Sequence, residues 1–247
     1  MTMKKENYFD GICHSAEFTR KELLESFRQG GYQLSEASFY KRVEDMVNSG
    51  EIIRVGRNRY CLPNGKQNVY SHKYSELAKE VAVYVGEMFP YLDFSIFELI
   101  QMNDFVNHLV AHNVIYLSVE SDVMDFVFDS LKEKYPGKVL INPTVDIYHK
   151  YWSDNMIVII KLTTEAPKGQ KESWHTRLEK ILVDIMSEPL LISTISEAEY
   201  PGIYMDAFKR YIVDRNSLIR YANRRKSIKK MRKLIHDKTD INLKPKG

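Results

Sequence analysis

Three arginines stand close together in the first quarter of the sequence, and their spacing suits the chemistry of phosphate binding. Arg54, Arg57 and Arg59 fall within six residues, with no acidic residue between them. Guanidinium groups donate hydrogen bonds to phosphate oxygens and base edges, so this group favours contact with nucleic acid. The expected contact residues, which include two uncharged hydrogen-bonding side chains, are Ser38, Lys41, Arg42, Arg54, Arg57, Asn58 and Arg59.

Acidic residues in the same segment leave a second interpretation open. Glu36, Glu44 and Asp45 lie beside the cations of the preceding predicted helix, where they weaken the local positive field. A protein-docking module would have a similar composition. We favour DNA binding because the arginine run itself contains no acid.

A second group of cations stands near the other end of the chain. No acidic residue occurs from Ser217 to Ile235, while apolar residues still recur at helical spacing. This pattern predicts a long basic helix over about 217–237 that packs by one face. Its charged face could be solvated, contact phosphates or meet an acidic partner protein, and spacing does not decide between these roles. The residues of this possible second basic surface are Arg220, Arg224, Arg225, Lys229, Lys230, Arg232 and Lys233.

Two histidines have a spacing that metal sites use. His108 and His112 stand at i and i+4 of a helix predicted over 104–112, but Leu109 occupies the position where a zinc protease needs glutamate. No third ligand is indicated by spacing. We therefore expect no metal site.

An enzyme would need carboxylates from the middle of the chain. Ile159 stands two positions before Lys161, where a restriction-type nuclease needs an acid. The sequence also has no glycine-rich phosphate loop, serine nucleophile elbow or Cys-x-x-Cys pair. We expect a non-enzymatic protein without a cofactor. In the alternative, a nucleic-acid-processing enzyme, the carboxylates would come from Asp122, Asp125, Asp146, Asp154 or Glu165.

Glu179, Lys180 and Asp184 form another charged group, on a helix predicted over 174–186. They could be interpreted as a catalytic cluster. Because apolar residues alternate with them at core spacing, we expect these charges instead to pair along the helix.

Capping and turn residues indicate the elements that position the first basic group. Thr19 and Glu22 have capping-box spacing, so a helix begins there, and Gly30-Gly31 ends it. Ser35 caps a second helix, and residues 51–63 have the strand and turn residues of a hairpin. Helix, turn, helix and hairpin predict a winged helix-turn-helix.

The chain therefore has two predicted domains. The winged helix-turn-helix spans 1–66, with its first helix from about 4–13, and an α/β domain spans 67–247. The fold class is α+β, ending in the long basic helix. The predicted strands of the second domain are 114–119, 139–141 and 156–162, its predicted helices are 74–88, 104–112, 122–135, 174–186 and 217–237, and 94–100 fits either type.

Charge is distributed unevenly along the 247 residues. Residues 1–70 carry 11 basic and 9 acidic residues (+2), 71–206 carry 11 and 21 (−10), and 207–247 carry 14 and 3 (+11). Basic ends around an acidic middle are expected if one region meets nucleic acid and another does something else. Two cysteines, no signal-peptide pattern and short apolar runs predict a cytoplasmic protein without a membrane segment.

Three segments together resemble the AbiEi-like antitoxins and transcription regulators of type IV toxin–antitoxin systems. The segments are MVNSGEIIRVGRNRYCLP, RLEKILVDIM and LIRYANRRKSIKKMRKLI. The resemblance implies a bacterial protein whose N-terminal domain binds inverted repeats in its own promoter and represses transcription. It also implies a C-terminal domain that counteracts a nucleotidyltransferase toxin encoded nearby. A transcription regulator without a toxin partner would have the same domain organisation.

Overall fold

The computed structural model describes residues 9, 18–32, 34–49, 51–56, 58–62, 69–169 and 171–243. It confirms the α+β class: helices accompany two separate β-sheets. The chain divides into two compact units, one of Met1–Val69 with Arg210–Asn216 and one of Tyr70–Lys209 with Ser217–Gly247. Within the described ranges, no helix has the length and apolar character needed to cross a membrane.

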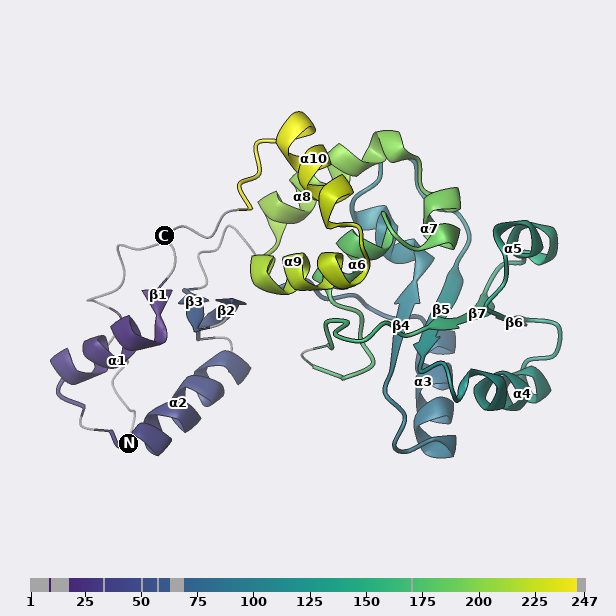
Figure 1. Cartoon of the computed structure of the whole chain (residues 1–247). Coiled ribbons are helices and arrows are strands. Elements are labelled where there is room, and N and C mark those ends of the chain that lie inside the picture. Colours follow the sequence, from purple (N-terminus) through teal and green to yellow (C-terminus); the bar gives the residue numbers. More distant parts are fainter. Residues whose placement is uncertain are drawn as a thin grey trace. The chain divides into compact units, whose positions relative to one another are not determined.

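The first unit combines two helices with a small antiparallel sheet (Figure 1). The strand order is β1-β3-β2. The residues expected to form a first helix, 4–13, lie outside the described residues except for Phe9. The elements are β1 (Phe18–Thr19), α1 (Arg20–Gln29), α2 (Glu36–Asn48), β2 (Ile53–Gly56) and β3 (Arg59–Cys61).

The predicted capping box at the start of α1 is present. The Thr19 hydroxyl accepts a hydrogen bond from the amide of Glu22 at 3.2 Å, and the Glu22 carboxylate accepts from the amide of Thr19 at 2.5 Å. Phe27 of α1 meets Phe39 of α2 edge-to-face, with ring centroids 5.8 Å apart. This contact joins the two helices in one core and leaves their polar faces exposed.

The second unit begins with α3 and contains the larger sheet. Its elements up to the last strand are α3 (Glu76–Met88), β4 (Phe94–Glu98), the 3-10 helix η1 (Leu99–Asp104), β5 (Val114–Val119), α4 (Met124–Lys134), β6 (Val139–Ile141), α5 (Val145–Tyr151) and β7 (Met156–Lys161). The elements that follow are α6 (Leu178–Asp184), α7 (Pro189–Thr194), η2 (Glu197–Glu199), α8 (Tyr200–Arg210), α9 (Arg215–Arg224) and α10 (Ile228–Lys238).

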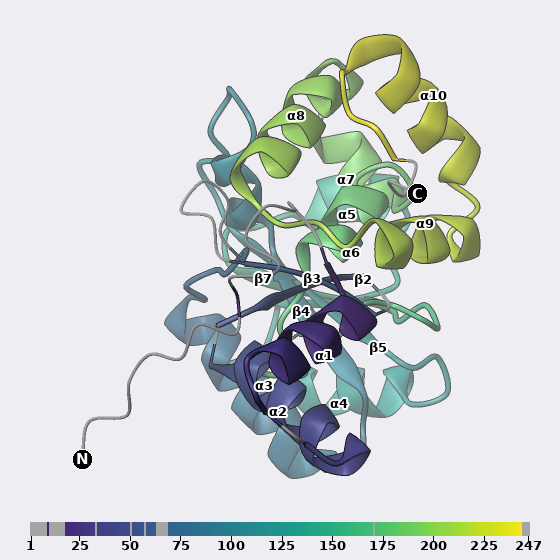
Figure 2. The same ribbon diagram turned by 90° about the vertical axis from the view of Figure 1, so that its left-hand side faces the viewer.

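The larger sheet has the strand order β4-β5-β7-β6. β5, β7 and β6 are parallel, while β4 is an antiparallel edge strand. Helices α3 and α4 pack on one face, and the helices that follow β7 lie on the other (Figure 2). Both faces are covered, and this explains why every residue of β5 is buried and why the Ile157–Ile160 run of β7 is continuously apolar.

The helix predicted over 104–112 is wrong. The chain forms η1 before this segment and then leaves helical geometry. The Asn103 side chain accepts from the amide of Val110 at 2.6 Å and donates to its carbonyl at 3.0 Å, so it closes a loop in place of a helix. His108 and His112 consequently do not stand on successive turns of a helix.

The helix predicted over 174–186 is shorter than expected, because α6 begins at Leu178. The preceding residues follow the edge of β4 instead. The amide of Ile96 donates to the carbonyl of Trp174 at 2.8 Å, and the Thr176 hydroxyl donates to the carbonyl of Ile96 at 2.6 Å. Residues 174–176 thus bond to β4 and do not begin a helix.

The long basic helix predicted over 217–237 is also wrong, because the structure divides it into α9 and α10. Lys226 between them has a φ of 57°, in the left-handed region. The amide of Ser227 donates to the carbonyl of Ala222 at 2.9 Å, and the amide of Lys226 donates to that of Asn223 at 3.0 Å. These bonds form a Schellman motif, which ends α9 without a glycine.

Candidate nucleic-acid interface

Helix α2 presents two of the predicted contact residues to solvent. Phe39 and Val43 are buried in the core of the first unit, so other positions of the helix are exposed. Ser38 and Lys41 are among them. The Ser38 hydroxyl lies 2.9 Å from that of Ser35, the N-cap residue. Lys41 forms no ion pair with any residue that the structure describes, so its charge is available to a ligand.

The hairpin of β2 and β3 presents another predicted cation. Arg54 is exposed, and its side chain has no hydrogen bond or ion pair within the described ranges. The turn is closed by Asn58, whose φ of 57° lies in a region that asparagine tolerates, and whose carbonyl accepts from the amide of Arg20 at 3.1 Å. Arg57, predicted at the same turn, lies outside the described residues.

The other two predicted cations lie near carboxylates of the chain itself. The Arg42 guanidinium is 3.2 Å from Glu51, and both side chains are 37% exposed. The pKa of Glu22 is lowered first by its hydrogen bond from the amide of Thr19, and the charge of Arg59 lowers it further. Ion pairs as accessible as Arg42–Glu51 stabilise a protein by about 0–1 kcal/mol, so a phosphate could replace Glu51 at small cost.

Sequence spacing did not indicate a role for Arg20. Its guanidinium lies 4.9 Å above the centre of the Tyr40 ring and donates to the Tyr60 hydroxyl at 3.2 Å. The hydrogen bond with Tyr60 raises the pKa of Arg20. These contacts join α1, α2 and β3 and position Tyr40, which is 44% exposed. The three residues are far apart in the sequence, so no local pattern could have predicted the contact.

Exposed acids share α2 with the cations. The Tyr40 hydroxyl donates to Glu36 at 2.9 Å, and Glu44 and Asp45 are also exposed. The exposed face of α2 is therefore mixed in charge.

Only some cations of the second basic group are without a partner in the chain. Four of its seven cations have partners in the chain: Arg220 with Glu165, Arg224 with Thr164, Arg225 with Thr163 and Glu188, and Lys230 with Glu197. The exposed cations without an ion pair to a described residue are Lys229, Arg232 and Lys233. This basic surface is therefore smaller than predicted and lies on α10.

Arg225 belongs to a buried polar network around Asp184. Asp184 is 6% exposed, its Oδ2 lies 2.6 Å from Lys180 Nζ, and its Oδ1 accepts from the Tyr221 hydroxyl at 2.9 Å and lies 3.5 Å from Arg225 Nε. Glu188 lies 2.8 Å from Arg225. Burial raises the pKa of Tyr221, and the negative charge of Asp184 raises it further. Burial lowers the pKa of Arg225, but the charges of Asp184 and Glu188 help to raise it above its ordinary value. Tyr221 of α9 and Arg225, which directly follows α9, thus fasten this helix to Asp184 of α6.

Comparison with known proteins places this chain in a family. Its residues 38–241 match DUF6577, a family of unknown function, over more than half of the chain. The chain belongs to the DUF6577 family. No curated protein matches it in sequence. The crystal structure of RV2827C protein from Mycobacterium tuberculosis aligns with 97% of this chain and 84% of its own at 10% identity, but the TM-score of 0.25 supports no argument about fold or function.

In this DUF6577 chain, two of the carboxylates considered for catalysis lie at opposite ends of one strand. Asp154 precedes β7 and Glu165 follows it, so the six residues of the strand, about 20 Å, separate them. His108 lies 3.1 Å from Glu199, and His112 lies 3.8 Å from Asp154. Among the described residues, no group of three or more His, Cys, Asp or Glu side chains could hold a metal ion. The other carboxylates, all exposed, are Asp122, Asp125 and Asp146.

Sequence spacing also gave no indication of the buried carboxylate of Glu98. Its Oε1 accepts from the Asn113 side chain at 2.6 Å, and its Oε2 accepts from the amide of Ser75 at 2.9 Å and lies 3.1 Å from His72 Nε2. These contacts connect the start of α3, the end of β4 and the residue before β5. Both oxygens of the Glu98 carboxylate therefore have polar partners in the interior of the second unit of this chain.

Proposed function

We propose that this chain is a DNA-binding transcriptional regulator in which α1, α2 and the β2–β3 hairpin act as a winged helix-turn-helix. In such a unit the second helix enters the major groove and the hairpin contacts the adjacent backbone. The order helix, short turn, helix, hairpin supports this role, as does the joining of α1, α2 and β3 through Arg20.

One observation carries the proposal: an exposed cation without an ion-pair partner stands on each of the two elements that would meet DNA. These are Lys41 on α2 and Arg54 on β2, with Ser38 and Asn58 as uncharged hydrogen-bonding neighbours. Phosphate contacts by such cations give affinity, while hydrogen bonds to base edges give specificity. The separation of Asp154 and Glu165 along β7 favours this binding role over cleavage by a site that uses both carboxylates.

A finer proposal follows from the resemblance to AbiEi-like antitoxins. The DNA would be inverted repeats in the promoter of the chain's own gene, and the second unit would counteract a nucleotidyltransferase toxin encoded beside it in the cytoplasm of a bacterium. A neighbouring reading frame for such a toxin would support this role, and its absence would leave a stand-alone regulator.

The test is binding of the full chain to duplex DNA from upstream of its own gene, compared with an unrelated duplex of equal length. We expect the own sequence to bind more tightly in fluorescence anisotropy. Replacing Lys41 and Arg54 with alanine should weaken binding, by roughly 1–3 kcal/mol for each contact that reads a base and by less for a phosphate contact.

A charge-matched control separates a local contact from a general loss of positive charge. Lys79→Ala with Lys132→Ala removes two exposed cations from α3 and α4 of the second unit, and this variant should bind like the wild type. Equal affinity of the Lys41 and Arg54 double variant and the wild type would reject the interface. It would instead favour the protein-docking role that the exposed acids Glu36 and Glu44 suggest.

A further inference from the structure

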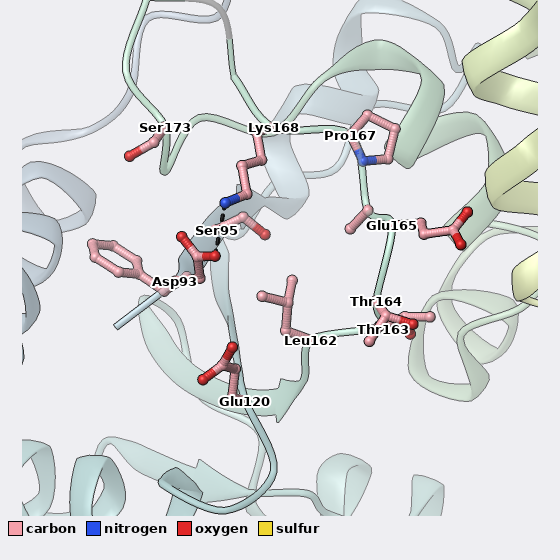
Figure 3. Close-up of a pocket in the computed structure, with 12 residues that line it drawn as sticks. Asp93, Ser95, Glu120, Leu162, Thr163, Thr164, Glu165, Pro167, Lys168 and Ser173 are labelled. Atoms are coloured by element: carbon pink, nitrogen blue, oxygen red, sulfur yellow. Dashed lines mark hydrogen bonds and ion pairs between the residues drawn. The ribbon is translucent and has the colours of Figure 1, made fainter. Parts of the chain in front are cut away.

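A pocket opens in the second unit at the edge of the larger sheet. Glu120 follows β5, Leu162 follows β7 and Asp93 precedes the antiparallel β4, so all three reach the same edge (Figure 3). Ligands of open α/β sheets bind outside the carboxyl ends of parallel strands. The cavity volume of about 250 Å³ is slightly below that of pockets for drug-sized molecules, so the occupant would be small.

Ser95 of β4 lines this pocket with an unused hydroxyl. The side chain is 5% exposed, and its Oγ is buried without any hydrogen-bond partner. Figure 3 shows it directed toward the space between Leu162 and Lys168. An unsatisfied buried hydroxyl costs about 1–3 kcal/mol, and rotation about a single side-chain bond would allow it to pair with a guest.

Negative charge predominates among the ionisable groups of the pocket. Lys168 Nζ lies 2.7 Å from Asp93 Oδ2, so this cation is already neutralised. Glu165 lies 3.7 Å from Arg220, and both side chains are more than half exposed. Glu120 forms no ion pair with any residue in the described part of the chain. A phosphate would find no free cation here, whereas an ammonium group would find a carboxylate.

The wall of the pocket opposite β4 is a loop that the fold holds in place. A Cβ added at Gly169 would lie 2.0 Å from the Glu172 carbonyl, so only glycine permits this close approach. The Thr163 hydroxyl accepts from Arg225 at 2.9 Å, which ties the loop to the network around Asp184. The pocket is therefore formed before any ligand arrives.

We propose that this pocket binds a small organic cation, a primary amine on a short aliphatic body. The ammonium group would donate to Glu120 and to the Ser95 hydroxyl, and the aliphatic body would lie against Leu162 and Pro167. This inference goes beyond the DNA-binding role and does not depend on it.

The probe is 1,5-diaminopentane, titrated into the full chain by isothermal titration calorimetry. We expect saturable binding at millimolar amine, and Glu120→Gln should weaken it about tenfold because a charge-assisted hydrogen bond is lost. Ser95→Ala should weaken it about two- to tenfold. The Ser95→Ala chain should melt at or above the wild-type temperature, since the variant removes an unsatisfied polar atom.

Matched probes and a matched variant make the result decisive. Glu133→Gln, at an exposed position of α4, should bind the amine like the wild type. Neutral 1,5-pentanediol and the dianion glutarate should bind at least tenfold more weakly than the amine. The proposal is overturned by the absence of saturable amine binding, by equal binding of the diol or the dianion, or by full binding in the folded Glu120→Gln chain.

Discussion

At the residue scale, Glu98 carries a negative charge inside the second unit. Burial alone would raise its pKa, but hydrogen bonds from His72, Ser75 and Asn113 outweigh burial and lower the pKa below the ordinary value of 4.5. Because the pKa is lower in the folded chain than in the unfolded chain, the ionised carboxylate stabilises the folded chain at pH values above 4.5. This stability is lost as the pH falls through the folded-state pKa.

We therefore expect acid to reduce the free energy of unfolding more steeply in the wild type than in Glu98→Gln. Urea denaturation at a series of pH values from neutral to acid measures both curves. Glu133→Gln serves as the control, because Glu133 is exposed on α4 and forms no ion pair with any described residue, so its variant should keep the wild-type dependence on pH. If Glu98→Gln lost stability in acid as steeply as the wild type, the assignment of this charge would be wrong.

Asp184 shows how far spacing alone can predict a polar contact. Its i,i+4 relation to Lys180 predicted a pair along a helix, and the structure contains that pair. The Tyr221 hydroxyl, 37 residues further along, also bonds to Asp184. That contact and the burial of both charges depend on how α9 packs against α6, which local spacing does not encode. The sequence thus predicted the pair but not the network.

At the element scale, the break between α9 and α10 shows tertiary structure overriding a helical pattern. The sequence from Ser217 to Ile235 has neither glycine nor proline, so nothing local predicts a stop. In the structure, Arg225 turns inward to Asp184 and Glu188, and Lys226 takes a left-handed conformation. The left-handed conformation of Lys226 costs roughly 1–2 kcal/mol, and the turn that it makes gives the Arg225 guanidinium two carboxylate partners.

Glycine substitutions distinguish this break from a continuous helix. Lys226→Gly should raise the free energy of unfolding by about 0.5–1 kcal/mol, because glycine adopts positive φ without a Cβ clash. Lys233→Gly, inside α10, should lower it by about 1 kcal/mol. Chemical denaturation measures both changes. A continuous helix would instead make the two variants unstable to a similar degree.

At the scale of the whole molecule, the sequence predicted the class and most strands but not the arrangement. Val114–Val119 and Val139–Ile141 are strands with the predicted bounds, since apolar runs bounded by turn residues identify buried strands directly. The strand order β4-β5-β7-β6 depends on long-range pairing and could not be predicted. Helices α5, α7 and α8 were also missed, because α5 and α7 are short and α8 has proline and glycine near its start.

The candidate interface was predicted only in part for a related reason. Residue types and spacing singled out the cations, but they could not show which of them meet the chain's own carboxylates. Arg42 contacts Glu51, whereas Lys41 and Arg54 have no such partner within the described ranges. The interface proposed for DNA therefore depends chiefly on Lys41 and Arg54.

The most direct test measures affinity for upstream duplex DNA against salt concentration, for the wild type and the variant with alanine at Lys41 and Arg54. If these cations each replace a counterion on the duplex, the plot of log affinity against log salt should flatten by about 0.9 per lost phosphate contact. We predict weaker binding and a flatter slope in this variant, with a wild-type slope for alanine at Lys229 and Lys233 on α10. An unchanged slope at Lys41 and Arg54, or a loss confined to α10, would contradict the assignment of DNA binding to the first unit.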